Sequence, residues 1–117
     1  MQKRSFGSVT IFSIDEERVR TAADEYAAHL LASHPEIEEI VVFGSFAKGN
    51  YAPGSDLDIF ILLTHSDKER WDRASDFLPD GFPVPLDLFP LTRDEVAALG
   101  SPRMLAEIQA SRWRYQR

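Results

Sequence analysis

Two aspartates, Asp56 and Asp58, stand one residue apart at the start of an apolar run that extends over residues 57–63. Side chains alternate between the two faces of a β-strand, so both carboxylates are expected on the same face. Adjacent carboxylates repel each other, and oxygen ligands shared with phosphates are those that Mg²⁺ prefers. The pair therefore predicts a divalent metal site that acts on a phosphate.

A second apolar run, residues 38–43, predicts a buried strand that ends at Gly44 and Ser45. Glycine lets the backbone approach a ligand closely, and the serine adds a hydroxyl. A helical turn over residues 45–48 would also direct free amides at an anion. This segment predicts a phosphate-binding turn, although Gly-Ser taken alone is more typical of an ordinary turn.

A third carboxylate, Asp87, is expected near the pair. Residues 84–89 alternate as a strand with Asp87 on the face opposite Leu86 and Leu88. Because proline cannot donate to a sheet ladder, Pro85 and its neighbouring prolines favour an edge strand or a strand start. An aspartate among prolines could also be a loop residue.

Helix signals occupy most of the remaining chain. Helix starts are predicted at Ser13 with Glu16, Ser66 with Glu69, Thr92 with Glu95, and Ser101-Pro102. The second of these helices is expected to bury Trp71, Ala74, Phe77 and Leu78. The tail, residues 112–117, is expected to be extended, with its arginines Arg112, Arg114 and Arg117 solvated. Strands alternating with helices predict one α+β domain over residues 1–117, with helices packed against a small sheet in two layers.

The composition excludes several classes of protein. A net charge of −6 argues against general nucleic-acid binding, which needs a basic face, and the lack of cysteine excludes disulfides and thiolate metal sites. No stretch reaches transmembrane length and the start lacks an apolar signal core, so we expect a cytoplasmic protein without membrane contact. At 117 residues, a separate substrate domain does not fit. The acceptor surface is therefore expected from a partner or from a second copy in a homo-oligomer.

The residues discussed above lie in three segments, residues 43–49 (FGSFAKG), 54–59 (GSDLDI) and 86–88 (LDL). Together these segments resemble the nucleotidyltransferase superfamily that includes DNA polymerase β, and most closely its minimal stand-alone members. The resemblance implies a mixed sheet and the transfer of a nucleoside monophosphate, AMP from ATP, to a hydroxyl. The implied ligands of two Mg²⁺ ions are Asp56, Asp58 and Asp87, the last of which also accepts the hydroxyl proton. The implied triphosphate-binding residues are Gly44, Ser45, Lys48 and Ser55. Lys48 departs from the arginine common in the family, so bidentate phosphate contact is lost there.

Minimal members of this superfamily often occur beside a small helical HEPN-domain protein, as a toxin and antitoxin pair in which the nucleotidyltransferase adds AMP to the toxin. The resemblance thus implies an antitoxin that modifies a protein partner. Two alternatives stay open. One is a non-catalytic binding module that neutralises its partner by occlusion, and the other is a nucleotidyltransferase acting on a small molecule, such as an aminoglycoside.

Overall fold

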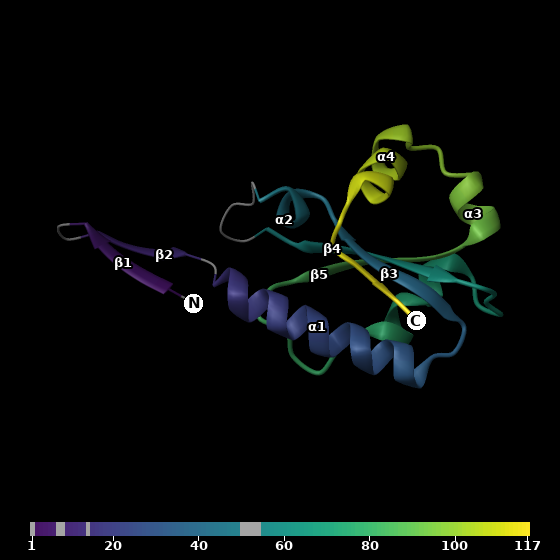
Figure 1. The fold of residues 1–117 in the computed structure, drawn as a ribbon, viewed down its shortest axis with the longest axis horizontal. Coiled ribbons are helices and arrows are strands. Elements are labelled where there is room, and N and C mark those ends of the chain that lie inside the picture. The colour runs from purple at the N-terminus through teal and green to yellow at the C-terminus, as the bar shows by residue number, and fades with distance from the viewer. Residues whose placement is uncertain (1, 7–8, 14, 50–54) are drawn as a thin grey trace.

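The structure is a computed structural model and describes residues 2–6, 9–13, 15–49 and 55–117 (Figure 1). Its strands are β1 Gln2–Phe6, β2 Val9–Ser13, β3 Ile37–Phe43, β4 Leu57–Leu63, β5 Leu86–Thr92 and β6 Arg114–Gln116. Its helices are α1 Glu16–Ser33, α2 Ser45–Lys48, α3 Arg93–Ala97 and α4 Pro102–Ala110, with two 3₁₀ helices, η1 Arg70–Asp72 and η2 Ala74–Phe77.

A four-stranded sheet in the order β5-β4-β3-β6 forms the centre of the molecule. β3 pairs antiparallel with β4 and with β6, whereas β4 pairs parallel with β5. The predicted mixed sheet is therefore confirmed, and β5 lies at its edge, as the prolines predicted. The predicted strands over residues 38–43 and 57–63 match β3 and β4, while the third begins and ends a few residues later than expected, at β5.

Helices cover both faces of this sheet. The fold therefore has one more layer of helices than the two-layer arrangement that the sequence predicted. α1 packs its buried side chains, such as Tyr26 and Leu30, against Ile40 and Ile59 of the central strands. On the opposite face, Ile108 of α4 belongs to a second cluster of buried side chains from β3, β4 and β5. Figure 1 shows α1 below the sheet and the short helices α3 and α4 above it.

The chain before α1 forms an antiparallel hairpin, β1–β2, that the sequence analysis did not predict. In Figure 1 this hairpin extends away from the sheet. The helix start predicted at Ser13 with Glu16 is wrong, because Ser13 ends β2 and the N-cap of α1 is Asp15. The Asp15 carboxylate accepts a hydrogen bond of 3.1 Å from the backbone N–H of Arg18, which satisfies one of the free amides of the first turn.

The helix predicted from Ser66 is also wrong, since this segment contains only η1 and η2. Of the side chains expected inside, Phe77 is buried, but Trp71 is 78% exposed and Leu78 is 61% exposed. Hydrogen bonds to residues distant in the sequence hold these turns in place. The hydroxyl of Tyr26 on α1 donates to the Phe77 carbonyl at 2.7 Å, and Arg73 is bonded to three other segments.

Both C-terminal helix starts are confirmed. Thr92 and Glu95 form a complete capping box at α3, and Ser101 caps α4 with Pro102 in its first turn. The tail is extended as predicted, but two of its arginines are not simply solvated. Arg114 forms an ion pair with Glu39, 3.0 Å between Nε and Oε2, and donates to the carbonyls of Ile108 and Ser111, while Arg117 donates to the carbonyls of Ile37 and His34. These bonds hold β6 against β3.

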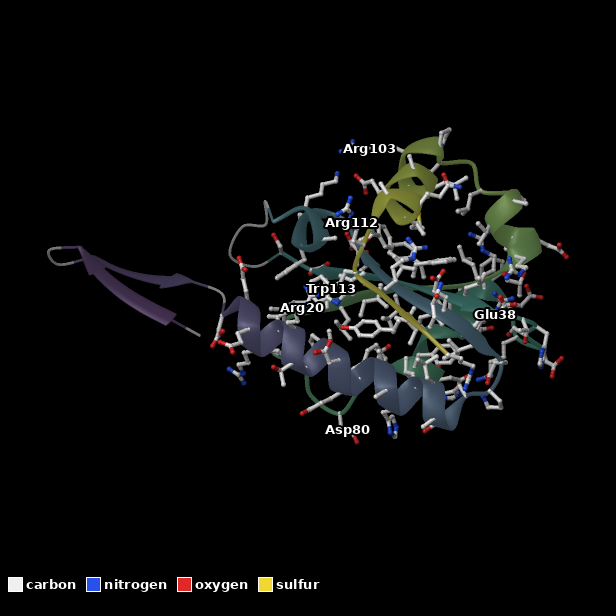
Figure 2. The ribbon with its side chains drawn as sticks, in the orientation of Figure 1. Arg20, Glu38, Asp80, Arg103, Arg112 and Trp113 are labelled. Atoms are coloured by element: carbon white, nitrogen blue, oxygen red, sulfur yellow. The ribbon has the colours of Figure 1, made fainter. Side chains whose placement is uncertain are left out.

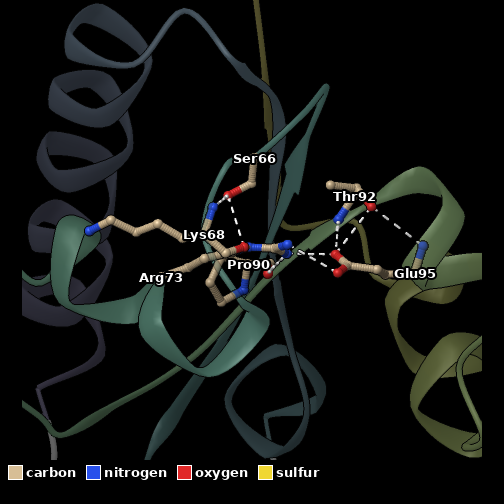
Figure 3. A network of polar contacts seen from close by, with 6 residues as sticks. All are labelled: Ser66, Lys68, Arg73, Pro90, Thr92 and Glu95. Carbon is tan, nitrogen blue, oxygen red and sulfur yellow. Dashed lines mark hydrogen bonds and ion pairs between the residues drawn. The ribbon is translucent and has the colours of Figure 1, made fainter.

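One arginine, Arg73, is buried with only 5% of its surface exposed (Figure 3). Its guanidinium makes a bidentate ion pair with Glu95, at 2.5 and 3.0 Å, and donates to the carbonyls of Lys68 and Pro90. The same Glu95 carboxylate accepts from the backbone N–H of Thr92 at 2.8 Å. This network ties the 3₁₀ segment to the edge strand β5 and to α3.

Replacing Glu95 with glutamine should destabilise the protein by about 3 kcal/mol at pH 7, because it leaves the buried Arg73 charge without its partner. Arg73 holds the pKa of Glu95 down to about 2. Because the pKa of Glu95 is lower in the folded state, its ionised carboxylate stabilises the native state at pH values above the ordinary pKa of 4.5. This stabilisation is lost as the pH falls through 2. Urea unfolding at pH 7 and at pH 3 should therefore show a smaller difference between Glu95→Gln and wild type at the lower pH.

The exposed Glu25 on α1 supplies the matched control for this substitution. Glu25→Gln removes the same charge without touching a buried cation, so its stability should stay close to that of wild type. Equal stability of Glu95→Gln and Glu25→Gln would show that the ion pair does not support the fold.

Candidate functional site

The predicted carboxylates gather where β3 ends and β4 begins. In the sheet register, Asp58 of β4 lies opposite Phe43 of β3 and beside Asp87 of the parallel strand β5. Asp58 and Phe60 share one strand face, and Phe60 belongs to the cluster beneath α4. The site thus opens on the face of the sheet that carries α4. Asp58 is half-buried, while Asp56 and Asp87 are exposed.

Gly44 lies directly against the Asp58 side chain. Its backbone has φ of +78°, a conformation that side-chain-bearing residues rarely adopt. A Cβ added at Gly44 would stand 2.2 Å from Oδ2 of Asp58, well inside contact distance. Glycine is therefore required here both for the turn and for the close approach of the carboxylate.

The pKa of the Asp58 carboxyl is raised to about 6, first by burial and then by the charges of neighbouring carboxylates. Those neighbours are Asp87, Asp56 and Glu107, in falling order of effect. The three aspartates predicted from the sequence are thus electrostatically coupled. Glu107 was not predicted, because it lies on α4 and no motif connects it with the strands; its contribution comes only from the fold.

The chemistry of these side chains fits Mg²⁺. Three carboxylates supply hard oxygen ligands, and a cation among them would relieve the mutual repulsion felt at Asp58. Among the residues that the structure describes, no three His, Cys, Asp or Glu side chains lie close enough together to hold a metal ion. Metal ligation by Asp56, Asp58 and Asp87 remains a prediction.

The turn after Gly44 is helical, as the sequence predicted, but α2 is only one turn long, residues Ser45–Lys48. So short a helix has a small macrodipole, and side-chain cations matter more for holding an anion. Lys48 is half-exposed and its Nζ lies 2.5 Å from Oε1 of Glu107. Ser45 is half-buried beside Gly44. The binding roles of Ser45 and Lys48 remain predictions.

Ser55, the fourth predicted triphosphate ligand, is half-buried immediately before Asp56. The polar loop predicted between Gly49 and Ser55 falls, for residues 50–54, outside the described part of the chain. The binding role of Ser55 is likewise a prediction that this geometry leaves in place.

A cavity of about 580 Å³ lies between α2 and α4. Its lining consists of Gly44, Ala47, Lys48, Arg103, Ala106, Glu107, Ala110, Ser111 and Arg112. Gly44 belongs both to the cavity wall and to the contact with Asp58, so the cavity reaches the turn that Asp58 approaches, although none of the three aspartates lines it. Arg112 is exposed, as expected for the tail, yet it lines this cavity.

Comparison with known proteins agrees with this arrangement. The nucleotidyltransferase domain family matches residues 24–108 of the 117. A solved structure from Sulfolobus solfataricus, described as a candidate nucleotidyltransferase, is 27% identical, covers 73% of this chain and 77% of its own, and has a TM-score of 0.57. A toxin-antitoxin structure with AMP-PNP is 21% identical, covers 83% of this chain and 70% of its own, and has a TM-score of 0.52, a likeness of fold alone. No curated protein matches the chain.

Within the described residues, none of the helices has both the length and the apolar character needed to cross a membrane.

Proposed function

We propose, since the chain belongs to the nucleotidyltransferase domain family, that it transfers AMP from ATP to a hydroxyl group on a partner protein. One observation carries this proposal: the half-buried Asp58 lies beside Asp87 and against Gly44, and Gly44 also lines the cavity between α2 and α4. Phosphate transfer depends mainly on positioning the phosphate and stabilising its charge, and carboxylates next to a glycine turn are suited to hold the metal ions that do this.

The proposed biological setting is a toxin and antitoxin pair, in which this chain is the antitoxin and a HEPN-domain protein is the acceptor. A solved toxin-antitoxin structure with AMP-PNP shares the fold of this chain, which supports that setting.

In the proposed mechanism, the acceptor hydroxyl attacks the α-phosphorus of ATP and the β- and γ-phosphates leave as pyrophosphate. These two phosphates would lie against Gly44 and Ser45, with Lys48 offsetting their charge. Asp56, Asp58 and Asp87 would hold two Mg²⁺ ions, which when bound stabilise the charge on the attacking and leaving oxygens. Asp87 is exposed on the edge strand, where a hydroxyl from a partner can reach it. There it accepts the proton of the attacking hydroxyl as general base.

Replacing Asp87 with alanine should reduce transfer at least about a thousandfold, because the proton acceptor and one metal ligand are lost together. Binding of ATP should change far less, since Gly44, Ser45 and Lys48 are retained. The measurement is the mass of the partner, the protein encoded beside this chain, after incubation with ATP and Mg²⁺. An AMP-sized increment is expected with wild type and none with Asp87→Ala.

Asp80 provides the control, an exposed aspartate that Figure 2 shows on the α1 side of the molecule, away from α4. Asp80→Ala should give the wild-type increment. If the wild-type complex forms but the partner gains no mass, the transferase proposal is wrong and neutralisation by occlusion takes its place.

A further inference from the structure

We infer that Arg103 and Arg112, together with Lys48, bind the polyphosphate of the nucleotide in the cavity between α2 and α4. This inference rests on the proposed function and extends it, because neither arginine belongs to the motifs of the strands. It assigns the cavity to a polyphosphate chain, and it makes α4 and the residues after it part of the binding site.

Arg103 lies in the first turn of α4 and Arg112 follows its end, and both line the same cavity as Gly44 and Lys48. Figure 2 shows the two arginines on the side of α4 that looks toward α2. Because Gly44 touches Asp58, an elongated anion in this cavity would have one end beside the carboxylates.

The cavity wall holds three cations, Lys48, Arg103 and Arg112, and a single carboxylate, that of Glu107. Glu107 lies 2.5 Å from Lys48 Nζ and 3.7 Å from Arg103 Nε, so it is shared between two of them. Within the described residues Arg112 makes no ion pair. An excess of positive charge in a chain of net charge −6 marks the cavity as a local site for an anion.

The backbone around Arg112 is anchored to the sheet, so it has little backbone entropy left to lose when an anion binds. Both neighbours of Arg112 are anchored to the same residue of the central strand β3. The Ser111 hydroxyl donates to the Val42 carbonyl at 2.5 Å, and the Val42 N–H donates to the Trp113 carbonyl at 2.9 Å. The backbone of Arg112 is therefore fixed at the edge of the cavity.

A polyphosphate beside Asp56, Asp58 and Asp87 is repelled by their charges, and one turn of helix in α2 offsets little of that repulsion. Lysine contacts a phosphate as a point charge, whereas arginine can make two parallel hydrogen bonds to its oxygens. Two arginines thus supply the bidentate contact that Lys48 cannot.

The test uses inorganic pyrophosphate with Mg²⁺ as the probe and titration calorimetry as the measurement. Arg103→Met and Arg112→Met should each weaken pyrophosphate binding about tenfold, as expected for a charge-assisted contact, and the double variant should weaken it further. Glu107→Gln should strengthen binding a few-fold, because the competing carboxylate charge is gone. Rising salt concentration should weaken the wild-type affinity more than that of the double variant.

Arg70→Met is the matched control, since Arg70 is exposed on η1 and lies outside the cavity lining. It should bind pyrophosphate like wild type. Absence of pyrophosphate binding by wild type, or equal affinities of wild type and the double variant, would overturn the inference.

This experiment separates the inference from the proposed function. If pyrophosphate affinity depends on Arg103 and Arg112 but the partner is never modified, the polyphosphate site stands without the transferase. If AMP is transferred and the double variant keeps the wild-type KM for ATP, the transferase stands and the arginine assignment is wrong.

Discussion

Asp58→Asn is expected to abolish transfer, a loss of at least about a thousandfold, and yet to make the metal-free protein more stable at pH 7. Loss of a metal ligand explains the first effect. The second follows because the ionised Asp58 carboxylate is half-buried among like charges. The gain should be about 1 kcal/mol in the free energy of unfolding, after allowing for partial exposure of the group.

The sign of the pH dependence supports this expectation. The pKa of Asp58 is raised to about 6 from an ordinary value of 3.8, so the folded state favours the protonated carboxyl. The stability that the protonated Asp58 carboxyl gives the folded state is therefore fully present below pH 3.8 and is lost as the pH rises through 6. Thermal unfolding without metal, followed between pH 4 and pH 8, should show this loss in wild type and not in Asp58→Asn.

Asp67, exposed in the segment after β4, serves as the control for simple charge removal. Asp67→Asn should keep both the transfer activity and the wild-type pH dependence. Near-normal transfer by Asp58→Asn would show that this aspartate does not bind the metal.

Gly44→Ala is expected to abolish transfer and to destabilise the fold by about 3 kcal/mol. Part of the cost is backbone strain, because Gly44 has φ of +78° with ψ of −153°, a region that only glycine occupies readily and that costs other residues about 2 kcal/mol. The remainder arises because the new Cβ would stand 2.2 Å from Oδ2 of Asp58 and must displace that carboxylate. Chemical denaturation and the partner-mass assay measure the two effects.

Gly81 offers an unusually close control. It has φ of +79°, nearly that of Gly44, but an added Cβ there would meet no atom within 4 Å. Gly81→Ala therefore reports the cost of a side chain at positive φ without a clash, and a larger loss of stability is expected for Gly44→Ala. A loss for Gly44→Ala no larger than that for Gly81→Ala would contradict a costly contact with Asp58. The double variant Gly44→Ala/Asp58→Gly should recover only the part of the stability that the clash removed, because the backbone strain at residue 44 persists, and it should not recover transfer, because the carboxylate is gone.

Local sequence signals were sufficient for the parts of the fold that local chemistry decides. The apolar runs ending at Phe43 and Leu63 formed strands because their side chains are buried on both faces of the sheet. The capping box of Thr92 and Glu95 formed because both partners lie within one helical turn. Gly44 follows directly after β3, so it comes to lie beside Asp58 at the start of β4 once these two strands pair.

The sequence analysis failed where distant residues decide the conformation. Around Arg73, capping signals predicted a helix, but bonds to Pro90 and Glu95 hold the segment in short 3₁₀ turns and leave Trp71 in solvent. Glu107 was missed for the same reason. Its proximity to Lys48, fifty-nine residues earlier in the chain, exists only after α4 has packed on the sheet.

The two outer strands of the central sheet also bear on how this protein meets other molecules. β5 contains Pro90, which has no N–H to offer a neighbouring strand, and β6 is only three residues long. Short strands and edge prolines are means by which proteins discourage strand-to-strand addition. The central sheet is thus poorly suited to growing by an added strand from another chain. Any partner or second copy is expected to contact helices, loops or the β1–β2 hairpin instead of extending the central sheet.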